Sequence, residues 1–132
     1  MLEVCCAIIV KGSEILAVQR GADSSHPHLW EFPGGKVNSG ESRLSCIVRE
    51  IAEELLVTVE VGNELQSVDF DYGQKQICLF PFVCKITSGE ILLNEHIAMQ
   101  WFNIENWETI DWSGADRQLI QINYASIKNS VG

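Results

Sequence analysis

The sequence predicts an α+β fold in which a mixed β-sheet is covered by helices on both faces, as in an α/β/α sandwich. Short apolar runs of strand-like composition recur along the chain, separated by glycine, proline and other turn residues. Two longer segments are predicted to be helices, and interspersed strands and helices favour one sheet between helical layers. Because 132 residues suffice for one hydrophobic core, we expect a single domain over residues 1–132.

The N-terminal elements are predicted from apolar runs and the turn residues between them. Gly12 and Ser13 separate two apolar runs, which indicates a β-hairpin. A polar stretch with one proline then indicates an exposed loop, and an aromatic-rich strand precedes a Pro-Gly-Gly sequence typical of a turn. The expected elements are strands over 4–11 and 14–19, a loop over 21–29, a short strand over 30–32 and a turn over 33–35.

The clearest helix is predicted over residues 41–55. Its apolar side chains recur at the spacing of one helix face, and this stripe consists of Leu44, Ile47, Val48, Ile51 and Leu55. The remaining elements are strands over 57–61, 65–71, 75–86 and 98–102, and a last helix over 114–128 with Ser113 as its N-cap.

Composition and charge exclude several classes of partner. With 18 acidic and 9 basic residues, the chain should repel a nucleic acid polymer, whose binding depends on Lys and Arg. No apolar run approaches the roughly 20 residues of a membrane helix, so we expect no membrane partner. The first residues contain Glu3 and lack a basic start, which indicates a strand rather than a signal peptide. The 5 cysteines include no C-x-x-C pair, which favours free thiols and a cytoplasmic location.

Three carboxylates share one face of the predicted helix. Glu50, Glu53 and Glu54 stand at positions i, i+3 and i+4, with no lysine beside them. A solvated acidic face is one interpretation. The alternative is a metal site, because a Pro-Gly-Gly turn lies just upstream and Glu95 follows in a polar segment before a strand. Oxygen ligands without Cys or His select hard cations such as Mg²⁺ or Mn²⁺.

Residues 35–57 (GKVNSGESRLSCIVREIAEELLV) resemble the Nudix box, G-x5-E-x7-R-E-U-x-E-E-x-G-U, in which U is aliphatic. All specified positions but one match at the right spacing, namely Gly35, Glu41, Arg49, Glu50, Ile51, Glu53, Glu54 and Val57. The preceding WEFPG resembles the strand and turn of the MutT-like branch. Leu56 replaces the glycine that ends the helix in a left-handed conformation. Since a leucine there would cost about 1–2 kcal/mol, we expect the helix to end differently.

The resemblance implies the Nudix fold and Mg²⁺-dependent hydrolysis of nucleoside triphosphates into a monophosphate and pyrophosphate, with Mn²⁺ as a substitute ion. In the family the last acids of the box bind the catalytic metal ions, which implies Glu50, Glu53 and Glu54 as ligands here. The Gly34 carbonyl is implied as a backbone ligand. Glu95 resembles the additional loop acid of MutT-like members, which acts as a ligand or a base.

Further candidate residues are implied around this centre. Arg49 is expected to orient a neighbouring carboxylate through a charge-assisted hydrogen bond, and so to belong to the catalytic set. Lys36 and Arg20 are candidate phosphate contacts, although Arg20 is also typical of a surface charge at a strand end. Phe32 and Phe82 are candidate pocket walls, although aromatic residues in strands also build ordinary core.

Asp116 is the candidate for recognising the nucleobase. The region around it resembles bacterial CTP pyrophosphohydrolases, and an ionised aspartate only accepts hydrogen bonds, which suits the exocyclic amine of cytosine or adenine. A protonated aspartate could also donate, so a guanine derivative such as 8-oxo-dGTP stays open. The competing interpretation is a capping box, S-x-x-D, formed by Ser113 and Asp116 at the helix start.

Three alternatives for function remain at this point. The first is pyrophosphate release from a triphosphate such as CTP, a modified dCTP or 8-oxo-dGTP. The second is hydrolysis of another nucleoside diphosphate derivative, such as ADP-ribose or a dinucleotide. The third is an inactive nucleotide-binding module, which the retained acids of the box disfavour. In each case the partner is a small-molecule nucleotide, and the chain acts as a monomer or a homodimer.

Overall fold

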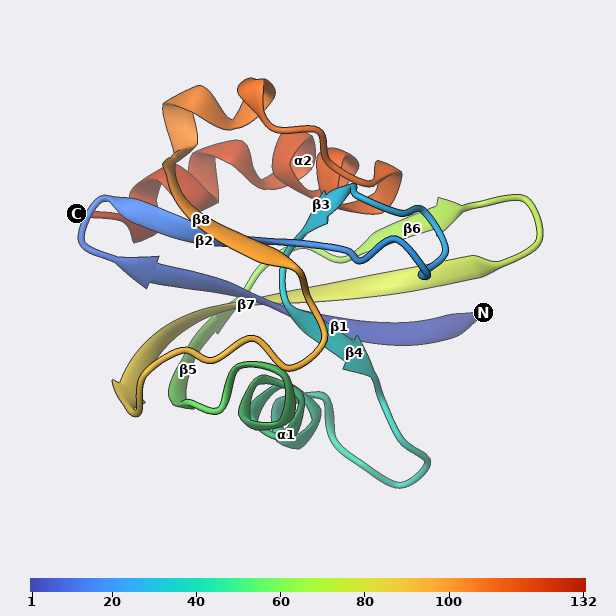
Figure 1. Cartoon of the computed structure of the whole chain (residues 1–132), viewed down its shortest axis with the longest axis horizontal. Helices are drawn as coiled ribbons and strands as arrows, with labels where there is room; N and C mark the ends of the chain where they lie inside the picture. The colour runs from blue at the N-terminus through green and yellow to red at the C-terminus, as the bar shows by residue number, and fades with distance from the viewer.

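A single mixed sheet of eight strands organises the computed structural model, which describes all residues from 1 to 132 (Figure 1). The elements are, in chain order, β1 (Leu2–Lys11), β2 (Glu14–Gln19), β3 (Trp30–Glu31), β4 (Gly34–Lys36), α1 (Arg43–Leu55), β5 (Thr58–Glu64), β6 (Val68–Asp71), β7 (Gln76–Ser88), β8 (Ala98–Asn103), the 3-10 helix η1 (Ile104–Thr109) and α2 (Gly114–Ser130). Strands β3, β2, β1, β7 and β5 follow one another across the sheet, while β4 pairs with β1, β6 with β7 and β8 with β2. The predicted α+β sandwich with a mixed sheet is confirmed.

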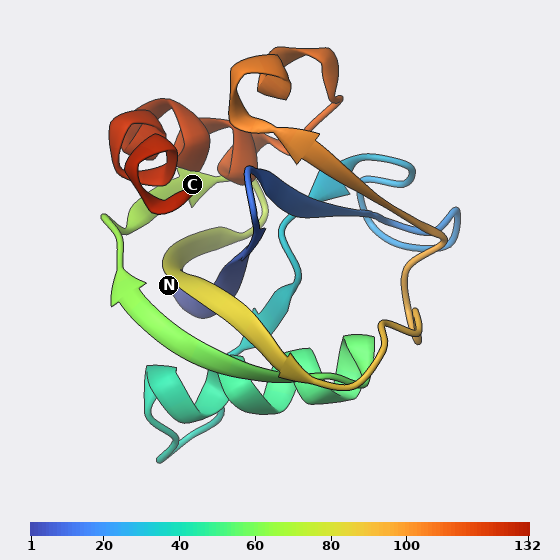
Figure 2. The same ribbon diagram turned by 90° about the vertical axis from the view of Figure 1, so that its left-hand side faces the viewer.

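Strand β1 is the centre of this sheet. Its first part runs parallel to β7, from Leu2 opposite Ile77 to Ile9 opposite Cys84, and its end turns antiparallel into β2. The odd-numbered residues from Cys5 to Ile9 pack with α1, and the even-numbered residues between them pack with α2 and η1. Figure 2 shows α1 on one side of the strands and α2 with η1 on the other. Because both faces of β1 are buried, its sequence is a continuous apolar run.

The N-terminal elements agree with the prediction except at the turn. The hairpin, the loop and the short strand are confirmed, but Gly34 and Gly35 form β4 rather than a turn. The reason is close packing. A side chain at Gly34 would collide with the Cys5 carbonyl, and one at Gly35 would collide with the Glu50 carboxylate. The two glycines therefore let β4 lie between β1 and the acidic side chains of α1.

Helix α1 begins and ends at well-defined caps. The Ser42 hydroxyl accepts a hydrogen bond from the Ser45 amide at 3.1 Å. At the other end Leu56 adopts a left-handed conformation with φ 59° and ψ 33°, so the expectation of a different ending is wrong. Its side chain is half-exposed. The predicted apolar stripe is buried at Ile47, Ile51 and Leu55 but not at Leu44, which lies in the first turn before the packed part of the helix.

The C-terminal part contains one element that the sequence pattern missed. The short helix η1 follows β8 and buries Ile104 and Trp107 in the core beside α2. Helix α2 begins at the predicted N-cap, Ser113, and extends two residues beyond the predicted end. None of the helices combines the length and apolar character required to span a membrane.

Candidate active site

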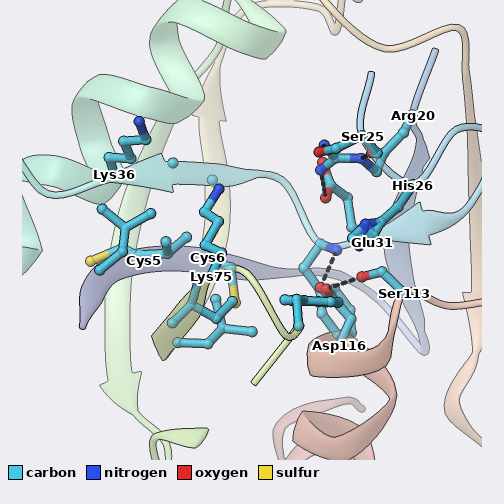
Figure 3. A pocket seen from close by; sticks show the side chains of 18 of the residues that line it. Cys5, Cys6, Arg20, Ser25, His26, Glu31, Lys36, Lys75, Ser113 and Asp116 are labelled. Carbon is cyan, nitrogen blue, oxygen red and sulfur yellow. Dashed lines mark hydrogen bonds and ion pairs between the residues drawn. The ribbon is translucent and has the colours of Figure 1, made fainter. Parts of the chain in front are cut away.

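A cavity of about 380 Å³ lies beside the central strands (Figure 3). Its wall is built by β1, β7, the β3–β4 segment, the β2–β3 loop, the β6–β7 hairpin and the start of α2. Lys36 and Asp116 lie on opposite sides of this cavity. Gly34 and Gly35 belong to its lining, and the same two residues contact the carboxylates of α1. The cavity and the acidic face of α1 therefore share β4 as a common border.

Glu54 is the buried carboxylate of this border, with only 3% of its surface exposed. It accepts a hydrogen bond from the Gly34 amide at 3.1 Å. Its pKa is raised to about 9, mainly by burial; the Gly34 hydrogen bond opposes this rise, and the negative charges of Glu31, Glu95 and Glu50 add to it. Glu54 is thus a carboxyl group surrounded by other acids.

Arg49 holds the other acids of the helix in place. Its guanidinium donates to Glu41 at 2.7 and 2.9 Å, to Glu50 at 2.9 Å and to Glu53 at 3.3 Å, and it also reaches the Lys36 carbonyl at 3.1 Å. The hydrogen bond from Arg49 lowers the pKa of Glu41 to about 2. Arg49 therefore ties α1 to the end of β4 and contacts two of the three expected ligands.

The fit of these acids to a divalent cation depends on both their arrangement and their donor atoms. No group of three His, Cys, Asp or Glu side chains converges into a ligand set in this structure, because Glu50 and Glu53 face Arg49 and Glu54 faces Gly34. The donor chemistry nevertheless fits. The atoms available are carboxylate and backbone oxygens, which hard cations prefer. A buried acid among negative neighbours is also a position where a cation would favour the ionised form.

Glu95 lies on the segment between β7 and β8, close to the C-terminal end of α1. The amide of Asn94 donates to the Glu54 carbonyl at 3.0 Å, and its side chain donates to the Glu53 carbonyl at 3.1 Å. Glu95 itself is exposed. Its negative charge is near enough to raise the pKa of Glu54. The structure therefore brings Glu95 to the helix that carries the other acids.

Arg20 lines the cavity, but its guanidinium is already engaged. It donates to Glu31 at 2.7 Å and to the carbonyl and hydroxyl of Ser25 at 2.8 and 3.2 Å. Burial raises the pKa of Glu31, but the hydrogen bonds from His96 and Arg20 outweigh it and hold that pKa below its usual value. Arg20 is therefore part of a partly buried charge cluster with Glu31 at the cavity wall.

Asp116 closes the far end of the cavity and joins two elements. One of its carboxylate oxygens accepts from the Phe32 amide at 2.9 Å, and the other accepts from the Ser113 hydroxyl at 2.6 Å (Figure 3). The capping-box interpretation is wrong, because the Ser113 hydroxyl donates to Asp116 instead of accepting from the helix backbone. Burial and the charge of Glu31 raise the pKa of Asp116 to about 7, although both hydrogen bonds lower it.

The two candidate aromatic walls have different positions. Phe32 lines the cavity and also packs in the core against Trp112, with ring centroids 4.9 Å apart. Phe82 is not at this cavity, because it faces the α1 side of the sheet and is buried in the core there. Side chains alternate along β7, so Ile77 and Leu79 face the cavity while Phe82 faces α1.

The β6–β7 hairpin supplies residues that the sequence analysis missed. Tyr72 and Lys75 line the cavity, and Lys75 extends toward it in Figure 3. The Tyr72 hydroxyl accepts from the Ala115 amide at 2.9 Å, and its ring contacts His26 with centroids 4.6 Å apart. The hairpin itself was predicted as two strand runs, but a lysine in a polar turn gives no signal that it faces a cavity.

The fold and this site define the family. The chain belongs to the Nudix family, because the family model described as NUDIX domain matches residues 1–121. It is a Nudix hydrolase, and enzymes of this family generally use a divalent metal ion. The CTP pyrophosphohydrolase of Escherichia coli (strain K12) is 35% identical over 121 residues, which cover 92% of this chain and 90% of that protein.

Two further relatives belong to the MutT-like branch of the family. The 8-oxo-dGTP diphosphatase of Escherichia coli (strain K12) is 26% identical over 120 residues, covering 90% of this chain and 93% of that protein. The crystal structure of the MutT protein from Methanosarcina mazei Go1 superposes with a TM-score of 0.85, with 25% identity, covering 95% of this chain and 94% of that chain. The predicted membership of the Nudix family is confirmed.

Proposed function

We propose that this chain is a Mg²⁺-dependent pyrophosphohydrolase, which converts a nucleoside triphosphate and water into a nucleoside monophosphate and pyrophosphate. The observation that carries the proposal is Glu54, a buried acid that is bonded to Gly34 at the border between the acidic helix and the cavity. The similarity to a CTP pyrophosphohydrolase and an 8-oxo-dGTP diphosphatase supports a free nucleotide as the substrate.

Five residues are proposed to hold the metal ion: Gly34 through its carbonyl, and Glu50, Glu53, Glu54 and Glu95 through their carboxylates. When bound, Mg²⁺ supplies positive charge that offsets the polyphosphate and the charge developing on its phosphoryl oxygens. Arg49 orients Glu50 and Glu53, and the Gly34 amide orients Glu54. The protein thus presents its acids already directed by hydrogen bonds, so little reorganisation is needed.

Lysines at the cavity are proposed to bind the phosphate chain. Lys36 follows the glycine pair of β4, and Lys75 lies on the β6–β7 hairpin. Neither forms an ion pair with an acid of the chain, whereas Arg20 is bonded to Glu31. We therefore place Lys36 and Lys75 in direct contact with phosphate, and Arg20 in support of the cavity wall through Glu31.

Asp116 is proposed to recognise the base, with Phe32 as a wall beside it. Each of its oxygens has accepted one hydrogen bond and keeps a second lone pair. The ionised carboxylate favours an exocyclic amine, as in CTP or a modified dCTP. Since the pKa of Asp116 is raised to about 7, the protonated form, which suits a carbonyl such as that of 8-oxo-dGTP, is also populated near neutral pH.

The test is pyrophosphate release from a panel of substrates with Mg²⁺ or with EDTA. The panel contains the (d)NTPs, 8-oxo-dGTP, 5-methyl-dCTP, ADP-ribose and a diadenosine polyphosphate. We expect metal-dependent release from a triphosphate, its loss in Glu53→Gln and Glu54→Gln, and a changed ranking of cytosine and guanine substrates in Asp116→Asn. Activity on ADP-ribose or the dinucleotide alone would refute the substrate class, and no activity on any compound would favour a nucleotide-binding module.

A further inference from the structure

The segment that carries Glu95 has no helix or strand, yet it is fixed at both ends. We refer to residues 92–97 as the Glu95 segment. At its start the Leu92 amide donates to the Leu55 carbonyl at 3.0 Å, and two residues later Asn94 binds the end of α1. At its end the Ile97 amide donates to the Gln19 carbonyl of β2 at 3.1 Å. The segment therefore bridges α1 and β2, with Glu95 between the two attachments.

His96 provides a third attachment, next to Glu95 itself. Its side chain is only 6% exposed, although Glu95 and Ile97 on either side are exposed. Its Nε2 atom lies 2.8 Å from one carboxylate oxygen of Glu31. The other oxygen of Glu31 is held by Arg20 at 2.7 Å, and Arg20 is in turn bonded to Ser25. Glu31 is thus a fixed acceptor, and His96 is bonded to a part of the protein that cannot easily shift.

The second ring nitrogen of His96 argues against a role in stability alone. Nδ1 is buried and has no hydrogen-bond partner. A buried polar atom without a partner costs about 1–3 kcal/mol, which offsets much of what the bond to Glu31 contributes to stability. What an apolar residue cannot supply is the directed bond to Glu31. The position is therefore suited to fixing the geometry of its neighbour.

We infer that His96 is a positioning residue, whose hydrogen bond to Glu31 holds the Glu95 segment so that Glu95 stays at the C-terminal end of α1. This inference rests on the proposed role of Glu95 at the metal site. It connects the two ends of the active site, because Glu31 lines the cavity while Glu95 lies at the acidic helix. His96 and Glu31 lie outside the Nudix box, and neither is among the proposed metal ligands.

The test compares His96→Phe, which keeps the volume, with His96→Gln, which keeps a donor. The affinity of the metal-free protein for Mn²⁺ is measured by electron paramagnetic resonance, together with kcat and KM at saturating metal. We expect His96→Phe to weaken Mn²⁺ binding about tenfold and His96→Gln to restore most of it, with a smaller change in KM for the nucleotide. Ile127→Val, on the buried face of α2, is the control that lowers stability without touching the segment.

A double-mutant cycle with Glu95→Gln shows whether His96 acts by positioning Glu95 or only by supporting the fold. If His96 acts through Glu95, His96→Phe weakens Mn²⁺ binding in the wild-type background and causes little further loss in Glu95→Gln. Equal losses in both backgrounds would overturn the inference. An unchanged Mn²⁺ affinity in Glu95→Gln alone would also overturn it, whereas the proposed function is judged separately by pyrophosphate release in the wild-type protein.

Discussion

Replacing Asp116 by asparagine should make the protein more stable at high pH. The pKa of Asp116 rises from 3.8 to about 7 on folding, mainly because the carboxyl group is buried. A carboxyl group with a raised folded-state pKa favours the fold fully below pH 3.8, and this contribution is lost as the pH rises through about 7. At about 1.4 kcal/mol per pKa unit, the full loss is about 4 kcal/mol, of which about 2–3 kcal/mol falls between pH 5 and pH 8.

Asparagine avoids this loss while keeping both contacts. Its carbonyl can accept from the Phe32 amide, and its amide can donate to the Ser113 hydroxyl, which rotates to accept. The assay is urea unfolding at pH 5 and pH 8 in EDTA. We expect the wild type to lose stability over this range and Asp116→Asn to lose about 2–3 kcal/mol less.

The control for this experiment is Ser113→Ala, which removes a hydrogen bond that lowers the pKa of Asp116. Without this hydrogen bond the pKa of Asp116 should rise further, so Ser113→Ala should lose more stability than the wild type between pH 5 and pH 8. If Asp116→Asn follows the same pH dependence as the wild type, the buried carboxyl does not titrate in this range and the argument fails.

Three further predictions concern other parts of the site and fold. Leu56→Gly should raise the free energy of unfolding by about 1 kcal/mol, because glycine adopts the left-handed conformation without strain, and a lower melting temperature would contradict this. Lys75→Ala should raise KM for the triphosphate about tenfold with little change in kcat, whereas Lys85→Ala, an exposed lysine away from the cavity, should change neither. Arg49→Lys should lower kcat about tenfold or more, because one ammonium cannot replace the several directed donors of a guanidinium, and an unchanged kcat would show that these contacts do not orient the acids.

Much of the fold follows from local patterns in the sequence. The hairpin at Gly12, the helix that carries Glu50 and the start of α2 at Ser113 were predicted because turn chemistry and apolar periodicity are local signals. The observed structure differs from the prediction where contacts between distant segments decide the conformation. Gly34 and Gly35 look like a turn locally, but their pairing with β1 makes them a strand. Leu56 likewise adopts a left-handed cap, although its residue type does not favour that conformation.

The site was predictable only where its residues form a motif. The spacing of Glu50, Glu53 and Glu54 placed them on one helix face, and the structure puts that face against β4. His96 and Lys75 were missed because each lies in a loop whose neighbours are set by the tertiary fold. The Phe32 amide was missed as a partner of Asp116 for the same reason, since Phe32 lies on a different part of the chain.

The parallel pairing of β1 with β7 also constrains how the chain can fold during synthesis. Leu2 lies opposite Ile77 and Ile9 opposite Cys84, so the central pair of the sheet joins segments that are far apart in the sequence. Closing so long a loop costs entropy before any contact is gained, which slows folding. A nascent chain that ends before β7 lacks the partner of its first strand. Helix α1, although synthesised earlier, then has no complete sheet to pack on until β7 has left the ribosome.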